Sequence, residues 1–564
     1  MHFKDMEYVR PDMEKVRADM GELLKEFEKA GSFEEQDAVI QKVNSLRIDF
    51  ISMRVLAFIN YSVNTADENF QMEQDYFDDK YPEYSELIAE YYKLLVNSQY
   101  REQIEQKYGK QFFNVAEMLL KTINPEVVNS LKTENHYGSQ YLKLIASAKI
   151  PFDGKELNLQ EFKPYFESLD RDVRRKAFEA YWNFFEENGA AFDELYDKMV
   201  TNRNNIAQKL GYKTFVDLAY MRMERSDYNA EDVARFRGYV KEHIVPLSSK
   251  LRELQKERLG LGELKVYDMP IFYRNGNAQP KGDPEWIVEQ GKKMYDELSP
   301  ETGEFFNYMI DHGLMDLYSR KGKADMGYCD FVPKYKNPFI FANMNGTEYD
   351  ITVLTHEAGH AFQAYSSSHF PIKEYYETTS DAAEIHSMSM EFLTWPWMNL
   401  FFGDQTEKFK YAHMASTMLF LPYGCLVDEY QHYVYENPND TPEQRRMKWL
   451  ELEKEYMPFI DYGGIKPLVE GRRWQKQGHI YEVPFYYIDY CLAQICAYQF
   501  WKKANENRDE ALEDYIKLCK AGGSQSFLDL VRYANLKSPF DPQCIKEMVK
   551  SVEDWLSGIE HMSL

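Results

Sequence analysis

Two histidines four residues apart, with a glutamate beside the first, are the residues of this chain best suited to chemistry. The stretch is His356-Glu357-Ala358-Gly359-His360. On an α-helix, residues four apart lie on one face, so His356 and His360 can direct two imidazoles at a single metal ion. Glu357 would then lie close enough to hold the water that the metal activates. The spacing therefore predicts a hydrolytic metal site with Glu357 as its general base.

A motif this short also has simpler explanations. Three fixed letters in five turn up by accident in a chain of 564 residues at a rate on the order of a few per cent. A histidine pair on a buried helix can also be satisfied by hydrogen bonds to neighbouring groups. The motif alone does not distinguish a metal site from these alternatives, so a metal site requires further candidate ligands elsewhere in the chain.

A second helix, expected from about residue 380, offers a third ligand. Glu384 and Glu391 are seven residues apart, which is two turns on one face, and Asp381 lies one turn before Glu384. Catalytic zinc usually takes three protein ligands and keeps one position open. We interpret Glu384 as the third ligand, and Asp381 and Glu391 as supporting carboxylates. Glu391 would orient a metal-bound imidazole; the alternative is that it is an ordinary surface residue.

Residues 477–490 gather protic side chains that could stabilise developing charge. Hydrolysis of a peptide bond builds negative charge on the carbonyl oxygen, and hydrogen-bond donors aimed at that oxygen lower the barrier. His479 is the better candidate, because the chain has only 12 histidines and two are already assigned. Each tyrosine is a weaker candidate, because most of the 43 tyrosines must be structural. The tyrosines considered are Tyr486, Tyr487 and Tyr490.

These stretches, in this order, resemble the thimet oligopeptidase family of zinc metallopeptidases, and most of all its oligoendopeptidase F branch, which includes the Pz-peptidases. The matches run from about residue 200 to the end of the chain, and the earlier part matches only as a helical leader. The segments that carry the resemblance are 220–228, 339–347, 356–360, 479–490, and Glu384 with Ser387 and Glu391.

The resemblance implies a mostly α fold, with two helical lobes that enclose a deep substrate channel and a small β-sheet beside the zinc-binding helix. One zinc ion per chain would be held by His356, His360 and Glu384. The implied activity is that of an endopeptidase that cleaves internal bonds of short oligopeptides and excludes folded proteins. His479 with Tyr487 or Tyr490 would stabilise the oxyanion, and the choice among the late tyrosines stays open.

Residues 337–343 predict a strand that leads into the metal-binding helix. An extended peptide could pair with its exposed edge through main-chain hydrogen bonds. The alternative is an interior strand of a small sheet with no free edge. The substrate-binding candidates are Phe341, Ala342, Asn343, Gly346 and Tyr486.

Hydrophobic spacing and capping residues predict the helices that must position these groups. Residues 11–30 and 32–64 predict a long helical hairpin, and residues 229–259 predict a helix bent at Pro246. Asn345-Gly346 predicts a turn, with Thr347 as the N-cap of the metal-binding helix. We place an N-terminal helical lobe at residues 1–200 and a catalytic zinc metallopeptidase domain at residues 201–564.

Composition restricts the class of protein further. A net charge of −25 argues against nucleic acid or an anionic membrane as a partner. The six cysteines form no CxxC pair, which is typical of reduced thiols in a cytoplasmic protein. Neither a signal peptide nor a membrane span is indicated, and a homo-oligomer is left open.

Two rival functions share much of this pattern. A zinc carboxypeptidase of similar helical fold would have the same paired histidines and later glutamate. A non-catalytic peptide-binding protein is the other rival, and Glu357 argues against it because a binder has no need of a base.

Overall fold

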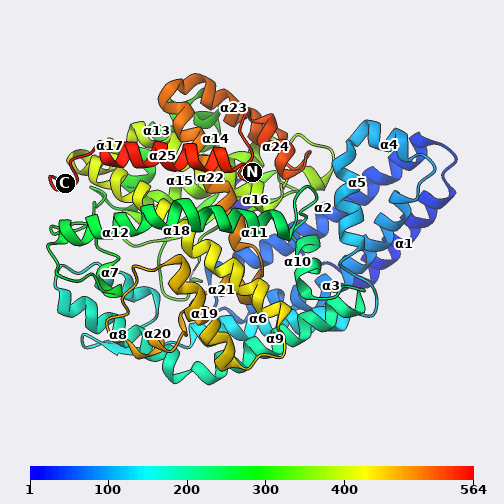
Figure 1. The fold of residues 1–564 in the computed structure, drawn as a ribbon. Helices are drawn as coiled ribbons and strands as arrows, with labels where there is room; N and C mark the ends of the chain where they lie inside the picture. The colour runs from blue at the N-terminus through cyan, green and yellow to red at the C-terminus, as the bar shows by residue number, and fades with distance from the viewer. Residues whose placement is uncertain (325) are drawn as a thin grey trace.

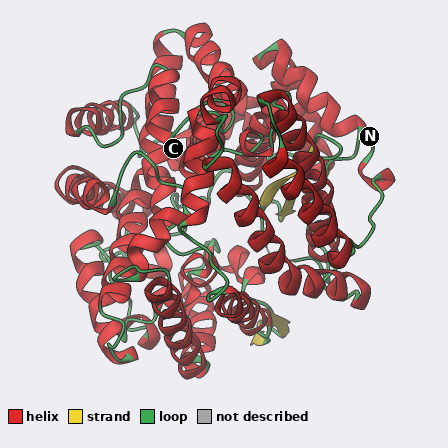
Figure 2. Ribbon diagram, turned by 90° about the vertical axis from the view of Figure 1, so that its right-hand side faces the viewer, coloured by secondary structure: helices red, strands yellow, loops and turns green. Residues whose placement is uncertain are grey.

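Helices make up most of this computed structural model, which describes residues 1–324 and 326–564. Two small sheets lie among them, and both are seen as separate yellow patches in Figure 2. The first is a hairpin of β1 (Ile150–Phe152) and β2 (Lys155–Leu157). The prediction of a mostly α fold with a small sheet beside the metal-binding helix is confirmed.

The first helices form the expected hairpin and a third helix joins it. They are α1 (Met13–Lys29), α2 (Phe33–Val63) and α3 (Glu68–Val96), which pack against one another at the blue end of the chain in Figure 1. Asp12 and Ser32 start the first two helices, because their side-chain oxygens accept hydrogen bonds from free backbone N–H groups of the first turn. The predicted hairpin is confirmed.

The other helices follow in order along the chain. Those before the three-stranded sheet are α4 (Arg101–Tyr108), α5 (Lys110–Leu120), α6 (Val128–Ala146), α7 (Lys163–Phe166), α8 (Arg171–Glu187), α9 (Gly189–Lys209), α10 (Phe215–Arg222), α11 (Ala230–Tyr239), α12 (Val245–Leu259), α13 (Pro284–Leu298) and α14 (Pro300–Asp311). Those after it are α15 (Tyr349–Ser367), α16 (Ser380–Leu393), α17 (Met398–Phe402), α18 (Thr406–Glu436), α19 (Pro442–Tyr456), α20 (Lys466–Val469), α21 (Gly478–Glu482), α22 (Tyr487–Glu506), α23 (Arg508–Ala521), α24 (Phe527–Tyr533) and α25 (Pro542–Ser557).

A π-helical turn, Val240–Ile244, separates α11 from α12. Pro246 stands in the first turn of α12 and has no N–H to donate into the preceding turn. The predicted bend at Pro246 therefore takes the form of a local widening of the helix. The proposed domain boundary at residue 200 lies inside α9, and the division into two domains stays a prediction.

The second sheet has the strand order β3-β5-β4. β3 (Met315–Tyr318) runs parallel to β5 (Asn337–Met344), and β4 (Tyr328–Val332) runs antiparallel to it. The strand expected at residues 337–343 is therefore present, and it is the middle strand. α15 follows it and packs on β4 and β5.

The metal-binding helix begins later than expected. α15 starts at Tyr349, and the Thr347 hydroxyl makes no capping hydrogen bond to it, because it donates to the Asn345 side chain. Instead, the Asp350 carboxylate in the first turn of α15 accepts hydrogen bonds from the backbone N–H groups of Asn345 and Gly346. The turn is therefore held by a side chain of the helix and not by a residue before the helix. The predicted turn is confirmed, whereas the prediction of Thr347 as N-cap is wrong.

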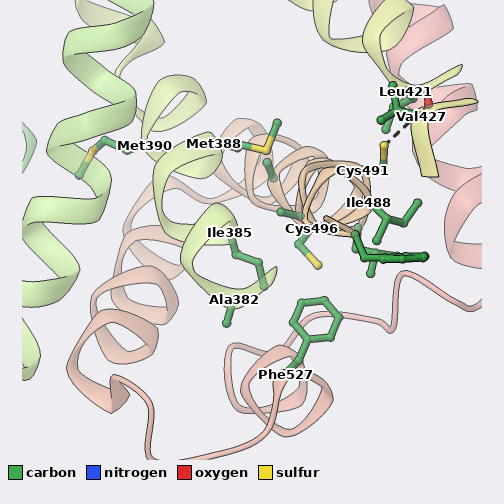
Figure 3. Packing of buried hydrophobic residues seen from close by; sticks show 14 of the residues in the cluster. Ala382, Ile385, Met388, Met390, Leu421, Val427, Ile488, Cys491, Cys496 and Phe527 are labelled. Carbon is green, nitrogen blue, oxygen red and sulfur yellow. Dashed lines mark hydrogen bonds between the residues drawn. The ribbon is translucent and has the colours of Figure 1, made fainter. Parts of the chain in front are cut away.

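α16 lies between α15 and α22, with which it makes extensive contacts. Figure 3 shows Ala382 and Ile385 of α16 beside Cys496 of α22, with Phe527 of α24 close by. This apolar packing fixes the helix that carries Glu384. All six cysteines are free thiols, and within the described residues no helix is both long and apolar enough to cross a membrane.

Candidate active site

Two adjacent helices bring three potential ligand atoms together. α15 carries His356 and His360 one turn apart, and α16 carries Glu384. The Oε2 atom of Glu384 lies 3.3 Å from Nε2 of His356 and 3.6 Å from Nε2 of His360. Ligand atoms at about 2.1 Å from a tetrahedral zinc ion lie about 3.4 Å from one another. The donor set and its spacing therefore fit a zinc ion.

Gly359 allows these two helices to approach closely. A Cβ atom at this position would lie 2.6 Å from the carbonyl oxygen of His386 and 2.6 Å from Cα of Ser387. Both are backbone atoms of α16 and cannot rotate away. The glycine between the two histidines is therefore what allows α16 to place Glu384 against them.

Two hydroxyl groups hold the Glu384 carboxylate. Tyr486 donates to its Oε1 at 2.5 Å, and Ser387 donates to its Oε2 at 2.9 Å. Burial raises the pKa of Glu384, but His360 and His356 outweigh it and lower the pKa to about 2. The carboxylate is thus ionised, as a metal ligand must be.

Glu357 has the environment of a general base. Only 7% of the residue is exposed, and among the described residues its Oε2 has no hydrogen-bond partner. Burial, together with the charges of Glu384 and Glu391, raises the pKa of Glu357 to about 7. The start of β4 lies beside it, since a Cβ atom at Gly327 would be 3.7 Å from its Oε1. The unpartnered Oε2 is free to accept a proton from a water molecule.

Glu391 supports one of the two histidines. Its Oε1 lies 2.7 Å from Nδ1 of His356, so that Nε2 of the same ring is left for the metal. Its Oε2 lies 2.7 Å from Nε2 of His413. Glu391 is buried, not an ordinary surface residue, and it contacts the histidine as expected.

His479 and Tyr490 form a pair of protic groups near the carboxylates. Nε2 of His479 lies 3.4 Å from the Tyr490 hydroxyl. On the other side of the ring, the Gln477 amide donates to Nδ1 at 2.9 Å, and the Tyr423 hydroxyl donates to the Gln477 carbonyl oxygen at 2.8 Å. Burial lowers the pKa of His479 to about 4. The ring is therefore a neutral imidazole whose N–H is on Nε2.

Two buried arginines hold the segment that carries these groups. Arg203 donates to the carbonyl oxygen of Ile480 at 2.9 Å. Arg225 donates to the carbonyl oxygen of Phe485 and to Asp489, each at 2.6 Å. Phe485 has a φ of 69°, which is strained for a residue with a side chain. The arginines thus maintain a strained turn directly before Tyr486.

Comparison with known families supports the likeness seen in the sequence. Residues 165–295 and 301–550 match the family described as "Peptidase family M3", and residues 3–123 match its "Peptidase M3 N-terminal domain". The chain belongs to peptidase family M3.

Individual relatives of this M3 peptidase place it in the oligoendopeptidase F branch. A solved structure titled "PZ PEPTIDASE A with inhibitor 2" is 52% identical, with 99% of this chain and 100% of that chain covered and a TM-score of 0.98. "Oligopeptidase PepF" from Bacillus subtilis (strain 168) is 23% identical over 423 residues, which is 72% of this chain and 60% of PepF. The chain thus spans less than two thirds of that curated relative.

The fold extends to more distant structures. Oligoendopeptidase F from Enterococcus faecium is 16% identical, with a TM-score of 0.66 and 98% of each chain covered.

The fold of the M3 peptidase brings most of the sequence-predicted residues into one site. Those with direct contacts described above are His356, His360, Glu384, Glu391, His479, Tyr486 and Tyr490, and Glu357 follows His356 on α15. Tyr487 packs its ring edge-on against His479, with centroids 4.9 Å apart. Asp381 lies elsewhere: it is buried and accepts a hydrogen bond from the Tyr228 hydroxyl at 2.7 Å.

The prediction that a peptide pairs with an exposed edge of β5 is wrong. Phe341 is in register with Asp316 of β3 on one side and with Tyr328 of β4 on the other. Ala342 accepts a hydrogen bond from Lys323, and the Asn343 side chain donates to main-chain carbonyls of the loop before β4. Within the described residues, β4 is an edge strand, and it begins beside Glu357.

Sequence reasoning missed several residues that complete the site. Gln477 lies in the segment singled out for its protic groups, but an amide gave no signal of a role. Tyr423 and His413 lie on α18, far from either motif along the chain. The scarcity of histidine could have drawn attention to His413, but only the fold shows what it contacts.

Proposed function

We propose that this chain is a zinc-dependent endopeptidase that hydrolyses internal bonds of short oligopeptides. The observation that carries the proposal is the convergence of His356, His360 and Glu384 beside a buried carboxylate, Glu357, with an open oxygen. A protein that only bound peptides would not need this carboxylate. The printed names of the relatives, oligopeptidase and Pz-peptidase, support the same substrate class.

When bound, zinc supplies Lewis-acid polarisation of the scissile carbonyl and lowers the pKa of water. Each of the three ligands is suited to hold it. Glu384 is ionised, His356 directs its lone pair at the site because its other nitrogen contacts Glu391, and His360 has a lowered pKa of about 4 because of burial. Glu384 and His360 are therefore in the protonation states that metal binding requires. Burial lowers the pKa of His356, but its contacts with Glu384 and Glu391 outweigh burial and raise that pKa well above the usual value, so His356 releases a proton when the metal binds.

Glu357 performs the proton transfers in this proposal. Its Oε2 accepts a proton from the attacking water, and the resulting carboxylic acid gives that proton to the amine that leaves. A pKa raised toward 7 suits both directions of transfer near neutral pH. The burial that raises the pKa also keeps bulk water from competing.

His479 and Tyr490 stabilise the negative charge that develops on the carbonyl oxygen. The neutral His479 ring carries its proton on Nε2, the nitrogen that faces the Tyr490 hydroxyl. Both groups can therefore donate hydrogen bonds toward the same oxygen. Tyr486 is already engaged with Glu384, and Tyr487 contacts His479 through its ring. We therefore assign the oxyanion contact to Tyr490 and a packing role to Tyr487.

The free edge of β4 is the better candidate for binding the substrate main chain. An extended peptide added to that edge would lie next to Glu357 and would be recognised through backbone hydrogen bonds, with little demand on its sequence. A deep channel between helical lobes would exclude folded proteins. The channel and the cytoplasmic location stay predictions, and the oligomeric state stays open.

The test is cleavage of an internally quenched, end-blocked peptide of about ten residues, followed by mass spectrometry of the products. Internal cleavage that a chelator abolishes and zinc restores is the expected result. A zinc-loaded protein that leaves this peptide intact but trims peptides with a free C-terminus would be a carboxypeptidase. A zinc-loaded protein that cleaves neither would be a binding protein.

A further inference from the structure

A chain of hydrogen bonds leads from His356 into the interior of the protein. Nδ1 of His356 lies 2.7 Å from Oε1 of Glu391, and Oε2 of Glu391 lies 2.7 Å from Nε2 of His413. The other ring nitrogen of His413, Nδ1, lies 3.3 Å from the indole Nε1 of Trp395. Four side chains from α15, α16, α18 and the 3₁₀ turn Trp395–Trp397 thus form one continuous series.

The donor in each hydrogen bond of this series can be worked out from its last member, Trp395. An indole N–H can only donate, so Nδ1 of His413 must be an acceptor and carries no hydrogen. The single hydrogen of the neutral ring is therefore on Nε2, and it is donated to Glu391.

The same reasoning continues to the metal site. Glu391 accepts from His413 through one oxygen, and its other oxygen accepts from Nδ1–H of His356. Once the His356 ring has a single hydrogen and carries it on Nδ1, its lone pair is on Nε2, the atom that lies 3.3 Å from Glu384. Glu391 thus directs Nε2 of His356 to the metal site, and His413 and Trp395 hold Glu391 in the position that does so.

The surroundings keep these groups from rearranging. Glu391, His413 and Trp395 are each less than 10% exposed. The His413 ring lies against the ring of Phe409, with centroids 5.5 Å apart and an interplanar angle of 19°, and also against Phe392. Water has little access to replace a broken hydrogen bond here, so each lost partner leaves a buried polar group unsatisfied.

We propose that His413 and Trp395 are positioning residues that hold His356 in its metal-binding tautomer and so raise the affinity of the site for zinc. This inference rests on the proposed zinc site. It adds two residues, His413 and Trp395, that follow Glu391 in the hydrogen-bonded series. The alternative is that His413 is an ordinary core histidine whose contact with Glu391 has no effect on the metal.

The experiment measures zinc affinity by competition with a chromophoric chelator. His413→Leu is expected to lower the affinity by about 10–100-fold, as is typical when the outer partner of a ligand is lost. His413→Gln should remain within about threefold of the unmodified chain, because its amide nitrogen can reach the place of Nε2 and donate to Glu391. His413→Asn is too short to do so and should behave like leucine.

Trp395→Phe is a second test that keeps the aromatic packing. Without the indole N–H, Nδ1 of His413 has no donor to accept from, the ring is held by Glu391 alone, and a smaller loss of affinity is expected. Nitrogen-15 spectra of the histidine rings should then show a changed signal for Nδ1 of His413, while its hydrogen stays on Nε2, opposite Glu391.

The matched control is His432→Leu on the same helix. His432 is 6% exposed and contacts the Tyr220 hydroxyl, not a metal ligand. This variant should lose stability but keep its zinc affinity.

The outcomes separate the two proposals. If His356→Ala abolishes zinc binding while His413→Leu and Trp395→Phe bind zinc as tightly as the unmodified chain, the positioning role is wrong and the zinc site stands. If the unmodified chain binds no zinc, or binds it equally well without His356, both proposals are overturned. If leucine at position 413 prevents folding, the glutamine and asparagine variants still decide the question.

Discussion

Replacing Gly359 by alanine adds a single methyl group at the point where α15 and α16 touch. The new Cβ atom would meet the backbone of His386 and Ser387 at 2.6 Å. Carbon atoms in ordinary contact are about 3.5 Å apart, so α16 must move away by about 0.9 Å, because backbone atoms cannot rotate aside. Glu384 lies one turn from Ser387 and must move with it.

Two effects on stability oppose each other in this variant. Alanine favours a helix over glycine by about 0.8–1.0 kcal/mol, whereas forcing an extra carbon into a packed interior costs about 1–3 kcal/mol. The net loss of stability is expected to be small, roughly 0–2 kcal/mol. The effect on the site is larger, because a misplacement of about 1 Å can lower the rate about 10²-fold.

The assay combines thermal unfolding, zinc affinity and kcat/KM for the quenched peptide. Gly359→Ala should unfold close to the temperature of the unmodified chain, yet lose about 10²-fold in kcat/KM and bind zinc more weakly. Gly21→Ala in α1 is the control, because a Cβ atom there meets nothing within 4 Å; it should gain about 0.8–1.0 kcal/mol of stability without a change in activity. Full activity and unchanged zinc affinity in Gly359→Ala would refute the argument that the site requires the close approach of α15 and α16 at this position.

Three further changes test individual roles. Glu357→Gln should abolish turnover and retain zinc, as metal analysis and kinetics together would show; an active variant would exclude Glu357 as the base. Tyr490→Phe should lower kcat by about 10²–10³-fold with little change in KM, whereas Tyr487→Phe should lower it far less; equal losses would contradict the assignment of the oxyanion contact. Gln477→Leu removes the hydrogen bond that fixes the His479 tautomer and should lower kcat by about fivefold to tenfold; an unchanged kcat would mean that His479 needs no such partner.

Local patterns along the chain were sufficient for the helices and for bringing the two proposed histidine ligands together on α15. A helix has a fixed period, so the positions of His356 and His360 already specify that their rings share a face. The helical hairpin of α1 and α2 is marked by Asp12 and Ser32, whose short polar side chains cap helices for reasons that involve only neighbouring residues.

Predictions that depended on distant neighbours failed or stayed open. Whether a strand lies inside a sheet or at its edge depends on which other strands pair with it, and residues 337–343 carry no sign that β3 and β4 cover both sides. Asp381 has the same spacing from Glu384 that suggests a supporting carboxylate. Its orientation toward Tyr228 is decided by the loop between α10 and α11, more than a hundred residues earlier.

The sequence by itself determined the chemistry of this protein: a paired-histidine motif, a later glutamate and a protic segment are properties of residue type and local spacing, and they indicate a metallopeptidase before any contact is known. The tertiary structure alone decided how those groups are held. Gly359 matters because of the backbone opposite it, Gln477 because of the nitrogen it reaches, and His413 because an indole lies behind it. Hydrogen-bond direction and close packing depend on pairs of atoms, and those pairs exist only once the chain has folded.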